Sequence, residues 1–146
     1  MDTLLIFIWI WGAMIAMSFW EAYVEGRNAW SKRKYGWRID LGGDFVFPAY
    51  HFYLFVIMWP LLLTLPFIMF GWDLHLFGVM ISAYASGTII EDFLWYVVNP
   101  KVKLREFWTE FSDYYPWFTV NGKKIVPLGY ILGILIAITA WLALWR

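Results

Sequence analysis

The sequence has 146 residues and a formal net charge of zero, and 62% of its residues are apolar, 23% aromatic and 15% charged. A water-soluble fold of this composition would have too few polar residues to cover its surface, so lipid is expected to surround much of the chain. The balanced charge gives no indication of nucleic-acid binding. Because the sequence contains no cysteine, disulfides and thiolate chemistry are excluded.

Apolar segments long enough to cross a membrane follow one another along the chain. We expect spans at about residues 3–25, 50–71, 74–98 and 127–145. Gly26 is a stop signal for the first span, and Pro60 and Pro66 predict a bend in the second. The predicted fold class is therefore an all-α membrane protein, a four-transmembrane-helix bundle in which residues 1–146 form a single integral membrane domain.

The segment between the third and fourth spans is rich in aromatic residues that alternate with charged ones, which is typical of a stretch lying at the membrane interface. Whether it lies on the bilayer or folds over the bundle as a lid is left open by this pattern. Near its end, Asn121-Gly122 stands between two short runs of β-forming residues and predicts a small β-hairpin with a type I′ turn. In the fourth span Gly129, Gly133 and Ala137 share one face, which should pack closely against another helix.

The distribution of basic residues predicts the orientation in the membrane. Both long loops are basic, with Arg27, Lys32, Arg33, Lys34 and Arg38 in the first and Lys101, Lys103, Arg105, Lys123 and Lys124 in the third. By the positive-inside rule, loops 26–49 and 99–126 are cytoplasmic and both termini lie outside.

Two carboxylates stand inside the third predicted span. Six apolar or aromatic residues follow Glu91 and Asp92 before the helix is expected to stop, so both should lie within the membrane boundary. Ionisable residues at such depth usually face the interior of a bundle and serve a function. Glu91 shares a face with the small residues Ala83 and Gly87 and is expected to point inward, while Asp92 lies about 100° around the helix.

A second acidic pair, Glu21 and Glu25, lies on one face at the end of the first span, and His51 begins the second span at the same membrane side. If these groups converge with Glu91 and Asp92, they form a cation-binding or ligand-binding pocket. Glu91, Asp92, Glu21 and His51 would be the metal ligands, and their oxygen-rich chemistry suits Mg²⁺ or Mn²⁺. Residues expected to support the pocket are Tyr50, Tyr84, Thr88, Tyr96, Asn99 and Arg38.

A purely structural interpretation competes with this hypothesis. The basic residues of the same membrane side can pair with the carboxylates, and His51 can bond to a backbone carbonyl or a tyrosine. The histidine spacings of di-iron bundles, membrane hydroxylases and zinc proteases are missing, as are nucleophile-elbow, Rossmann and Walker motifs.

Three functions therefore remain for this chain. The first is a small polytopic membrane protein whose cytoplasmic-face acidic pocket binds a cation or a polar lipid head group. The second is a non-catalytic accessory or scaffold subunit with a membrane-protein partner or a second copy of itself. The third is a metal-dependent membrane enzyme acting on a lipid or another amphiphile, so the sequence leaves open whether the protein is an enzyme. Membrane lipids are the expected partners in every case, and nucleic acid is not.

Overall fold

A computed structural model describes residues 2–29, 35–42 and 45–144. The chain divides into two compact units, Met1–Arg27 with Leu74–Arg146 and, separately, Asn28–Asp73. The first unit contains the helices α1 (Thr3–Glu25), α4 (Leu74–Val98) and α5 (Leu128–Leu144), the 3₁₀-helices η2 (Leu104–Trp108) and η3 (Glu110–Ser112), and the strands β3 (Trp117–Val120) and β4 (Lys123–Pro127). The second unit contains the strands β1 (Arg38–Gly42) and β2 (Phe45–Pro48) and the helical segments α2 (Ala49–His51), η1 (Phe52–Met58) and α3 (Trp59–Phe70).

The predicted spans correspond to helices in the structure. Among the described residues, three helices are long and apolar enough to cross a membrane, namely Thr3–Glu25, Ala49–Phe70 and Leu74–Val98. The shorter apolar helix Leu128–Leu144 has 17 residues, about 25 Å at 1.5 Å per residue, which is slightly less than a typical hydrocarbon core. The structure thus supports a multi-pass membrane protein, and the fourth crossing stays a prediction.

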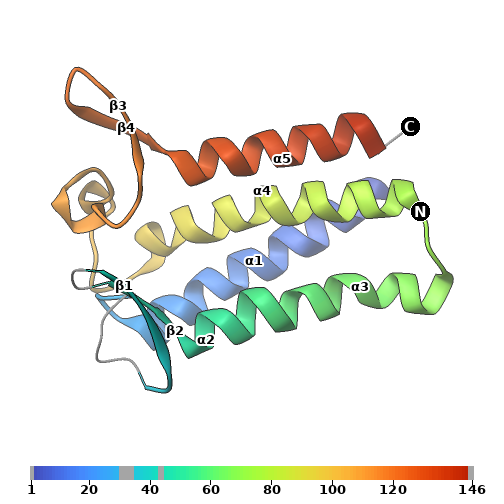
Figure 1. Ribbon diagram of the computed structural model, residues 1–146, viewed down its shortest axis with the longest axis horizontal. Coiled ribbons are helices and arrows are strands. Elements are labelled where there is room, and N and C mark those ends of the chain that lie inside the picture. Colours follow the sequence, from blue (N-terminus) through green and yellow to red (C-terminus); the bar gives the residue numbers. More distant parts are fainter. Residues whose placement is uncertain (1, 30–34, 43–44, 145–146) are drawn as a thin grey trace. The chain divides into compact units, whose positions relative to one another are not determined.

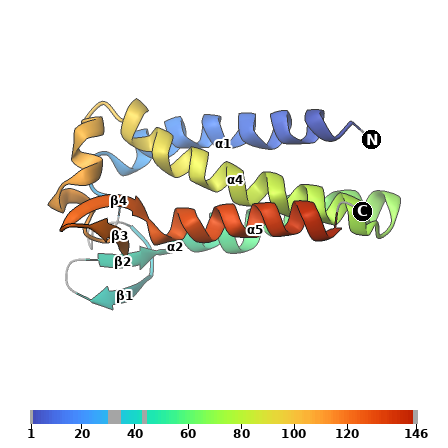
Figure 2. The same ribbon diagram turned by 90° about the horizontal axis from the view of Figure 1, so that it is seen from above.

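In the first unit, α4 packs against both α1 and α5, and Figures 1 and 2 show it running beside each of them. The helices α1 and α4 are parallel, because Asn99, which follows α4, donates from Nδ2 to the carbonyl of Gly26, which follows α1, at 2.7 Å. Gly26 adopts a positive φ of 65° and ends α1 as expected. The C-terminal ends of α1 and α4 therefore lie together at one end of this unit.

Small residues allow the helices of the first unit to approach closely. A Cβ atom on Gly87 would lie 3.0 Å from Cγ of Met14 in α1, and a Cβ on Gly133 would lie 2.9 Å from Cδ1 of Ile89 in α4. The predicted small-residue face of α5 therefore packs against α4 at Gly133, and Ala137 on the same face is buried as well. Gly129, the third member of that face, has no such neighbour within 4 Å in the structure, because it lies only one residue after the start of α5.

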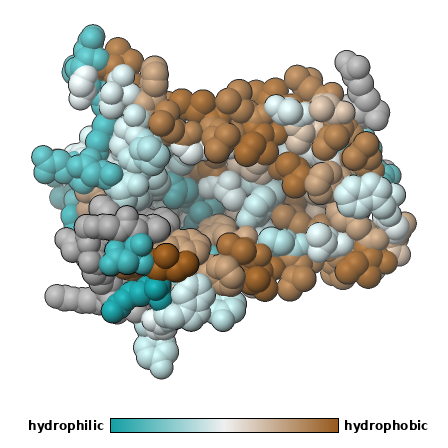
Figure 3. Space-filling view, viewed as in Figure 1, coloured by the Kyte–Doolittle hydropathy of each residue, from teal (hydrophilic) through white to brown (hydrophobic). Residues whose placement is uncertain are grey.

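The end of the first unit that carries η2, η3 and the β3–β4 hairpin is largely polar, whereas α5 is covered with apolar side chains, as Figure 3 shows. The hairpin confirms the predicted turn, since Asn121 and Gly122 have φ values of 50° and 74°, both positive as a type I′ turn requires.

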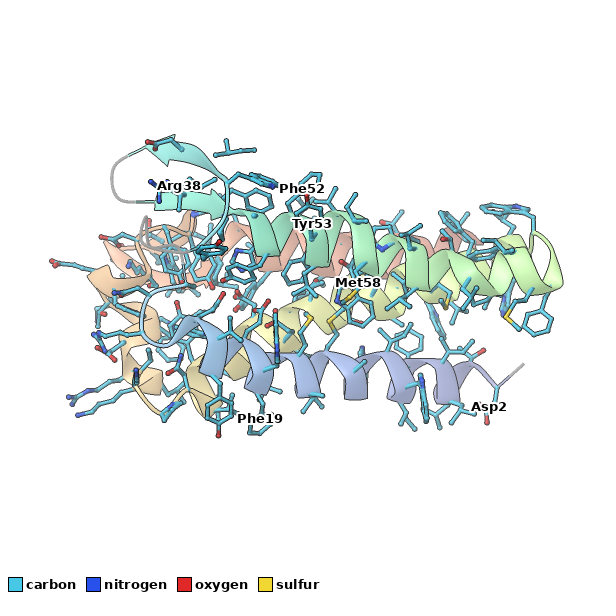
Figure 4. The ribbon with its side chains drawn as sticks, turned by 90° about the horizontal axis from the view of Figure 1, so that it is seen from below. Asp2, Phe19, Arg38, Phe52, Tyr53 and Met58 are labelled. Atoms are coloured by element: carbon cyan, nitrogen blue, oxygen red, sulfur yellow. The ribbon has the colours of Figure 1, made fainter. Side chains whose placement is uncertain are left out.

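The second unit begins with a hairpin that the sequence analysis did not anticipate. Strands β1 and β2 are antiparallel, with Ile39 opposite Phe47 and an irregularity between Asp40 and Gly42. The ring of Trp37 lies at the base of this hairpin and makes edge contacts with Phe52 and Tyr53, at centroid distances of 5.3 and 6.0 Å; Figure 4 labels both partners.

The predicted second span is continuous from Ala49 to Phe70 but not uniformly α-helical. Its segment Phe52–Met58 is a π-helix that ends two residues before Pro60. Because proline lacks an N–H group, a wider turn next to it lets the neighbouring backbone groups find other partners. Farther along, Thr64 bonds its hydroxyl to the Pro60 carbonyl at 2.8 Å, so this polar side chain is satisfied by its own helix.

The glycine contacts lead to a prediction about helix packing. Replacing Gly133 by Leu should force α5 away from α4 and lower the unfolding free energy by about 1–3 kcal/mol, because the added atoms enter occupied space. Gly129→Leu, four residues earlier on the same helix, is the matched control and should be nearly neutral. Thermal unfolding in detergent checks both variants; equal losses would contradict the packing described above.

Candidate functional site

The central feature of the first unit is a cluster of three buried carboxyl groups, named here the carboxyl cluster: Glu21, Glu25 and Glu91. Their exposed fractions are 4%, 8% and 4%. Glu21 and Glu25 come from the last turns of α1, where a spacing of four residues places them on one face. Glu91 comes from α4 and shares a side-chain hydrogen bond with Glu21, while Glu25 is close enough to act on Glu91 electrostatically.

The packing of α4 explains why Glu91 faces α1. Ala83 is fully buried, and Gly87, one turn later, faces Ile10 and Met14 of α1. Glu91 follows after one more turn, so it continues the same face toward the end of α1. The expectation that Glu91 points inward is therefore confirmed.

Hydrogen bonding in the carboxyl cluster requires a proton. A carboxylate only accepts hydrogen bonds, so the bond between Glu21 and Glu91 needs one proton held between the two groups. The Oε1 atom of Glu91 is buried, and within the described part of the chain it accepts no hydrogen bond. An unsatisfied buried acceptor costs about 1–3 kcal/mol, so this oxygen would be stabilised by a hydrogen-bond donor or by coordination to a cation.

Two basic side chains near this end of the unit, Arg27 and Lys124, are engaged with groups outside the carboxyl cluster. Arg27 donates to both carboxylate oxygens of Glu106, at 2.6 and 3.2 Å, and to the Lys101 carbonyl at 2.9 Å. Lys124 pairs with Asp113 at 2.5 Å. Among the described residues, no basic side chain forms an ion pair with Glu91. Of the other expected partners, Lys32, Arg33 and Lys34 lie outside the described residues.

The Arg27–Glu106 pair shifts the titration of both groups. The hydrogen bond from Arg27 is the main reason that the pKa of Glu106 falls to about 2, and the backbone N–H of Lys103 contributes as well. The same hydrogen bond with Glu106 raises the pKa of Arg27 above its ordinary value. This pair ties the end of α1 to η2, since Arg27 follows α1 directly.

Asp92 has a separate environment, in which tyrosine hydroxyl groups surround it. Tyr115 donates to both of its carboxylate oxygens at 2.7 Å, and Tyr130 of α5 donates to Oδ2 at 2.5 Å. Beside them, the hydroxyl groups of Tyr96 and Tyr114 are hydrogen-bonded to each other. Burial, and then the charge of Asp92, raises the pKa of Tyr115 well above its ordinary value, so its hydroxyl remains a donor. Both carboxylate oxygens of Asp92 therefore already accept hydrogen bonds from tyrosine side chains.

The aromatic segment between α4 and α5 folds onto these helices. Phe107 is only 3% exposed, and its ring contacts Phe93 and Tyr96 of α4 and Tyr130 of α5. The Ser112 hydroxyl bonds to the Phe107 carbonyl at 2.5 Å and fixes the turn between η2 and η3. These contacts anchor the segment on α4 and α5; a cover over the carboxyl cluster stays a prediction.

His51 belongs to the second unit, where it is buried among aromatic rings. Its ring lies 4.3 Å from that of Tyr50 and is stacked at 6.1 Å on that of Phe47. Glu21, Glu25 and His51 are thus all buried, and their side chains are of the kinds that could hold a metal ion. The convergence of His51 with the carboxyl cluster stays a prediction from the order of the spans.

The remaining expected residues have varied roles. Thr88 bonds its hydroxyl to the Ala85 carbonyl within its own helix. Asn99 joins the ends of α1 and α4 and accepts from the Lys101 N–H at 2.9 Å. Tyr84 is half-buried and lies close enough to Glu91 to interact with it electrostatically. Arg38 is an exposed residue of β1 in the second unit. The sequence analysis missed the partners of Asp92, and the signal available for them was the run of tyrosines at 114 and 115.

Comparison with known proteins adds no assignment: no protein-family model, curated protein or solved structure matches this chain. Its function is therefore argued from the geometry of the carboxyl cluster and of the surrounding residues.

The ion pair between Arg27 and Glu106 predicts a particular pH dependence. A carboxyl group whose pKa is lowered on folding stabilises the folded state only while it is ionised. The pair should contribute fully above the ordinary carboxyl pKa of 4.5 and lose its contribution as the pH falls toward about 2. The difference in melting temperature between the wild type and Glu106→Gln should therefore be constant from pH 6 to pH 5 and disappear near pH 2. Glu110→Gln, which alters an exposed carboxylate, is the control; an undiminished difference at pH 2 would refute the pairing.

The tyrosine hydrogen bonds to Asp92 predict a loss of stability when one donor is removed. Tyr115→Phe should lower the unfolding free energy by about 1.5–3 kcal/mol, the usual range for a hydrogen bond to a charged group. Tyr23→Phe removes a hydroxyl from an exposed position on α1 and should have no effect. The measurement is thermal unfolding in detergent at neutral pH, where indistinguishable melting temperatures for the two variants would argue against the bond.

Proposed function

We propose that this chain is a four-span membrane protein whose carboxyl cluster binds a divalent cation at one membrane face. The observation that carries the proposal is the buried hydrogen bond between Glu21 and Glu91, together with the open Oε1 atom of Glu91. Buried carboxylates of this kind are normally held by partners or occupied by an ion.

The electrostatics of the helix ends favour a positive ligand. The C-terminus of a helix carries a partial negative charge, and the parallel helices α1 and α4 bring two such ends together. No basic residue lies in the last turn of α1, which contains Glu25 and is preceded by Glu21. A cation at the cluster would offset both the carboxylates and the helix dipoles.

The ligand atoms favour a hard cation. Carboxylate oxygens are the preferred ligands of Mg²⁺ and Mn²⁺, and Glu21, Glu25 and Glu91 can each supply at least one. His51 is proposed as a further ligand because the second span begins at the membrane side where the first ends. Asp92, which was expected among the ligands, is proposed instead to hold the aromatic segment through Tyr115 and Tyr130.

The distribution of basic residues supports an orientation in which the carboxyl cluster faces the cytoplasm, with loops 26–49 and 99–126 on that side and both termini outside. In this orientation α5 is the fourth crossing, and it runs back to the outer face. The ion would then be drawn from the cytoplasm.

Metal titration of the purified protein tests the proposal. Chelator-treated wild type in detergent should regain about one Mg²⁺ or Mn²⁺ per chain and melt at a higher temperature with metal; a hundredfold excess over the dissociation constant corresponds to about 2.7 kcal/mol. Glu91→Gln should lose this stabilisation, although an amide can still donate to Glu21 and keep the fold. Glu110→Gln, an exposed acid of η3, should behave as the wild type does.

Proton release provides a second measurement. Because a cation would replace the proton shared by Glu21 and Glu91, its binding should release protons and weaken as the pH is lowered. If the wild type binds no metal and Glu91→Gln is simply less stable, the carboxyl cluster is structural. That result would favour an accessory or scaffold subunit and direct the search to a membrane-protein partner or a second copy of the chain.

A further inference from the structure

A second site lies outside the membrane-spanning helices, in the polar end of the first unit. A pocket of about 820 Å³ opens between η2–η3 and the turn of the β3–β4 hairpin. Its walls come from both sides, with Trp108, Glu110 and Phe111 on one side and Gly122, Lys123 and Lys124 on the other. Nothing in the proposed cation site uses these residues.

The pocket contains one positive and one negative side chain that are not paired with each other. Lys123 and Glu110 both line it, yet within the described chain neither forms an ion pair or a side-chain hydrogen bond. Lys124 is already neutralised, because it pairs with Asp113 and donates to the Thr109 carbonyl. The pocket therefore presents two separated, opposite charges and little net charge.

An aromatic surface lies beside the acidic group. Trp108 is 45% exposed, and its ring and that of Phe107 form a T-shaped pair at 4.9 Å, so part of the indole is accessible to a ligand. Phe111 is less available, since the Arg27 guanidinium covers its ring at 4.7 Å. An indole face next to a carboxylate is a favourable place for an alkylated ammonium group.

The position of the pocket along the chain places it at the level of lipid head groups. Strand β4 leads directly into the apolar helix α5, and η2 begins six residues after α4 ends. Figure 3 shows the change from apolar to polar side chains at this end of the unit. A molecule in the pocket would therefore have its polar part beside the membrane surface and its tails beside α5.

We infer that this pocket binds the zwitterionic head group of a phospholipid, with the phosphate at Lys123 and the ammonium group at Glu110 and Trp108. An anionic lipid could pair with Lys123 but would be repelled by Glu110, and a simple cation could pair with Glu110 but would be repelled by Lys123. Each would therefore neutralise only one of the two charges. A phosphocholine or phosphoethanolamine group carries both charges, joined by a short two-carbon linker, and can therefore satisfy both. The inference does not depend on the cation site, which lies between α1 and α4.

Soluble head groups test this inference on the full-length protein in a nonionic detergent. Isothermal titration should detect binding of glycerophosphocholine, with much weaker binding of choline alone or of inorganic phosphate alone. Lys123→Gln and Glu110→Gln should each weaken binding about tenfold, which is 1.4 kcal/mol. Arg105→Gln removes an exposed positive charge that does not line the pocket and should leave binding unchanged.

Native mass spectrometry extends the test to intact lipids. Protein taken from mixed phosphatidylcholine and phosphatidylglycerol vesicles should retain phosphatidylcholine, and Trp108→Leu should reduce this retention. Preference for phosphatidylglycerol, or tighter phosphate binding by Glu110→Gln than by the wild type, would show a plain anion site and overturn the inference. Equal binding by Lys123→Gln and the wild type would overturn it as well, provided that both elute as the same folded species.

Discussion

The first unit depends on how carboxyl groups are accommodated where two parallel helices end together. Helix α1 brings Glu25 to its last turn, where the helix dipole already places negative charge, and α4 brings Glu91 to the same cluster from about two turns before its own end. Water, which would normally stabilise such groups, is largely excluded, since Glu21 and Glu91 are each only 4% exposed. The hydrogen bond between Glu21 and Glu91 requires a shared proton, and Oε1 of Glu91 is left without a partner among the described residues; both support the proposed cation site.

The two acidic neighbours on α4 show two different solutions to this constraint. Asp92 receives hydroxyl groups from Tyr115 and Tyr130, so its charge is offset by groups that also hold the aromatic segment on α4 and α5. Glu91, about 100° around the helix, meets another acid instead. A buried carboxylate whose oxygens all accept hydrogen bonds contributes to stability, whereas one with an oxygen that lacks a donor is suited to binding a ligand. This contrast supports the proposed roles, a structural one for Asp92 and a binding one for Glu91.

Local patterns in the sequence predicted the features that are determined locally. Gly26 ends α1, Asn121-Gly122 forms the hairpin turn, and the spacing of Ala83, Gly87 and Glu91 correctly placed Glu91 on the packed face of α4. The tyrosine partners of Asp92 could not be predicted in this way, because they lie 23 and 38 residues away and reach it only through the fold of the segment between α4 and α5. The β1–β2 hairpin was missed although the sequence has a turn signal, Gly42-Gly43-Asp44, between two short runs that contain β-forming residues.

Small residues connect the packing of the helices to the chemistry of the carboxyl cluster. Gly87 allows α4 to lie against Met14 of α1, and only at such a separation can Glu91 reach Glu21 one turn farther along. A larger residue at position 87 would push α4 away from α1 and so separate the carboxyl groups of Glu21 and Glu91. On the opposite side, Gly133 brings α5 to the same helix and thereby places Tyr130 beside Asp92. The two glycines therefore determine the surroundings of both acids: Gly133 helps to bring Tyr130 to Asp92, and Gly87 lets Glu91 lie beside Glu21.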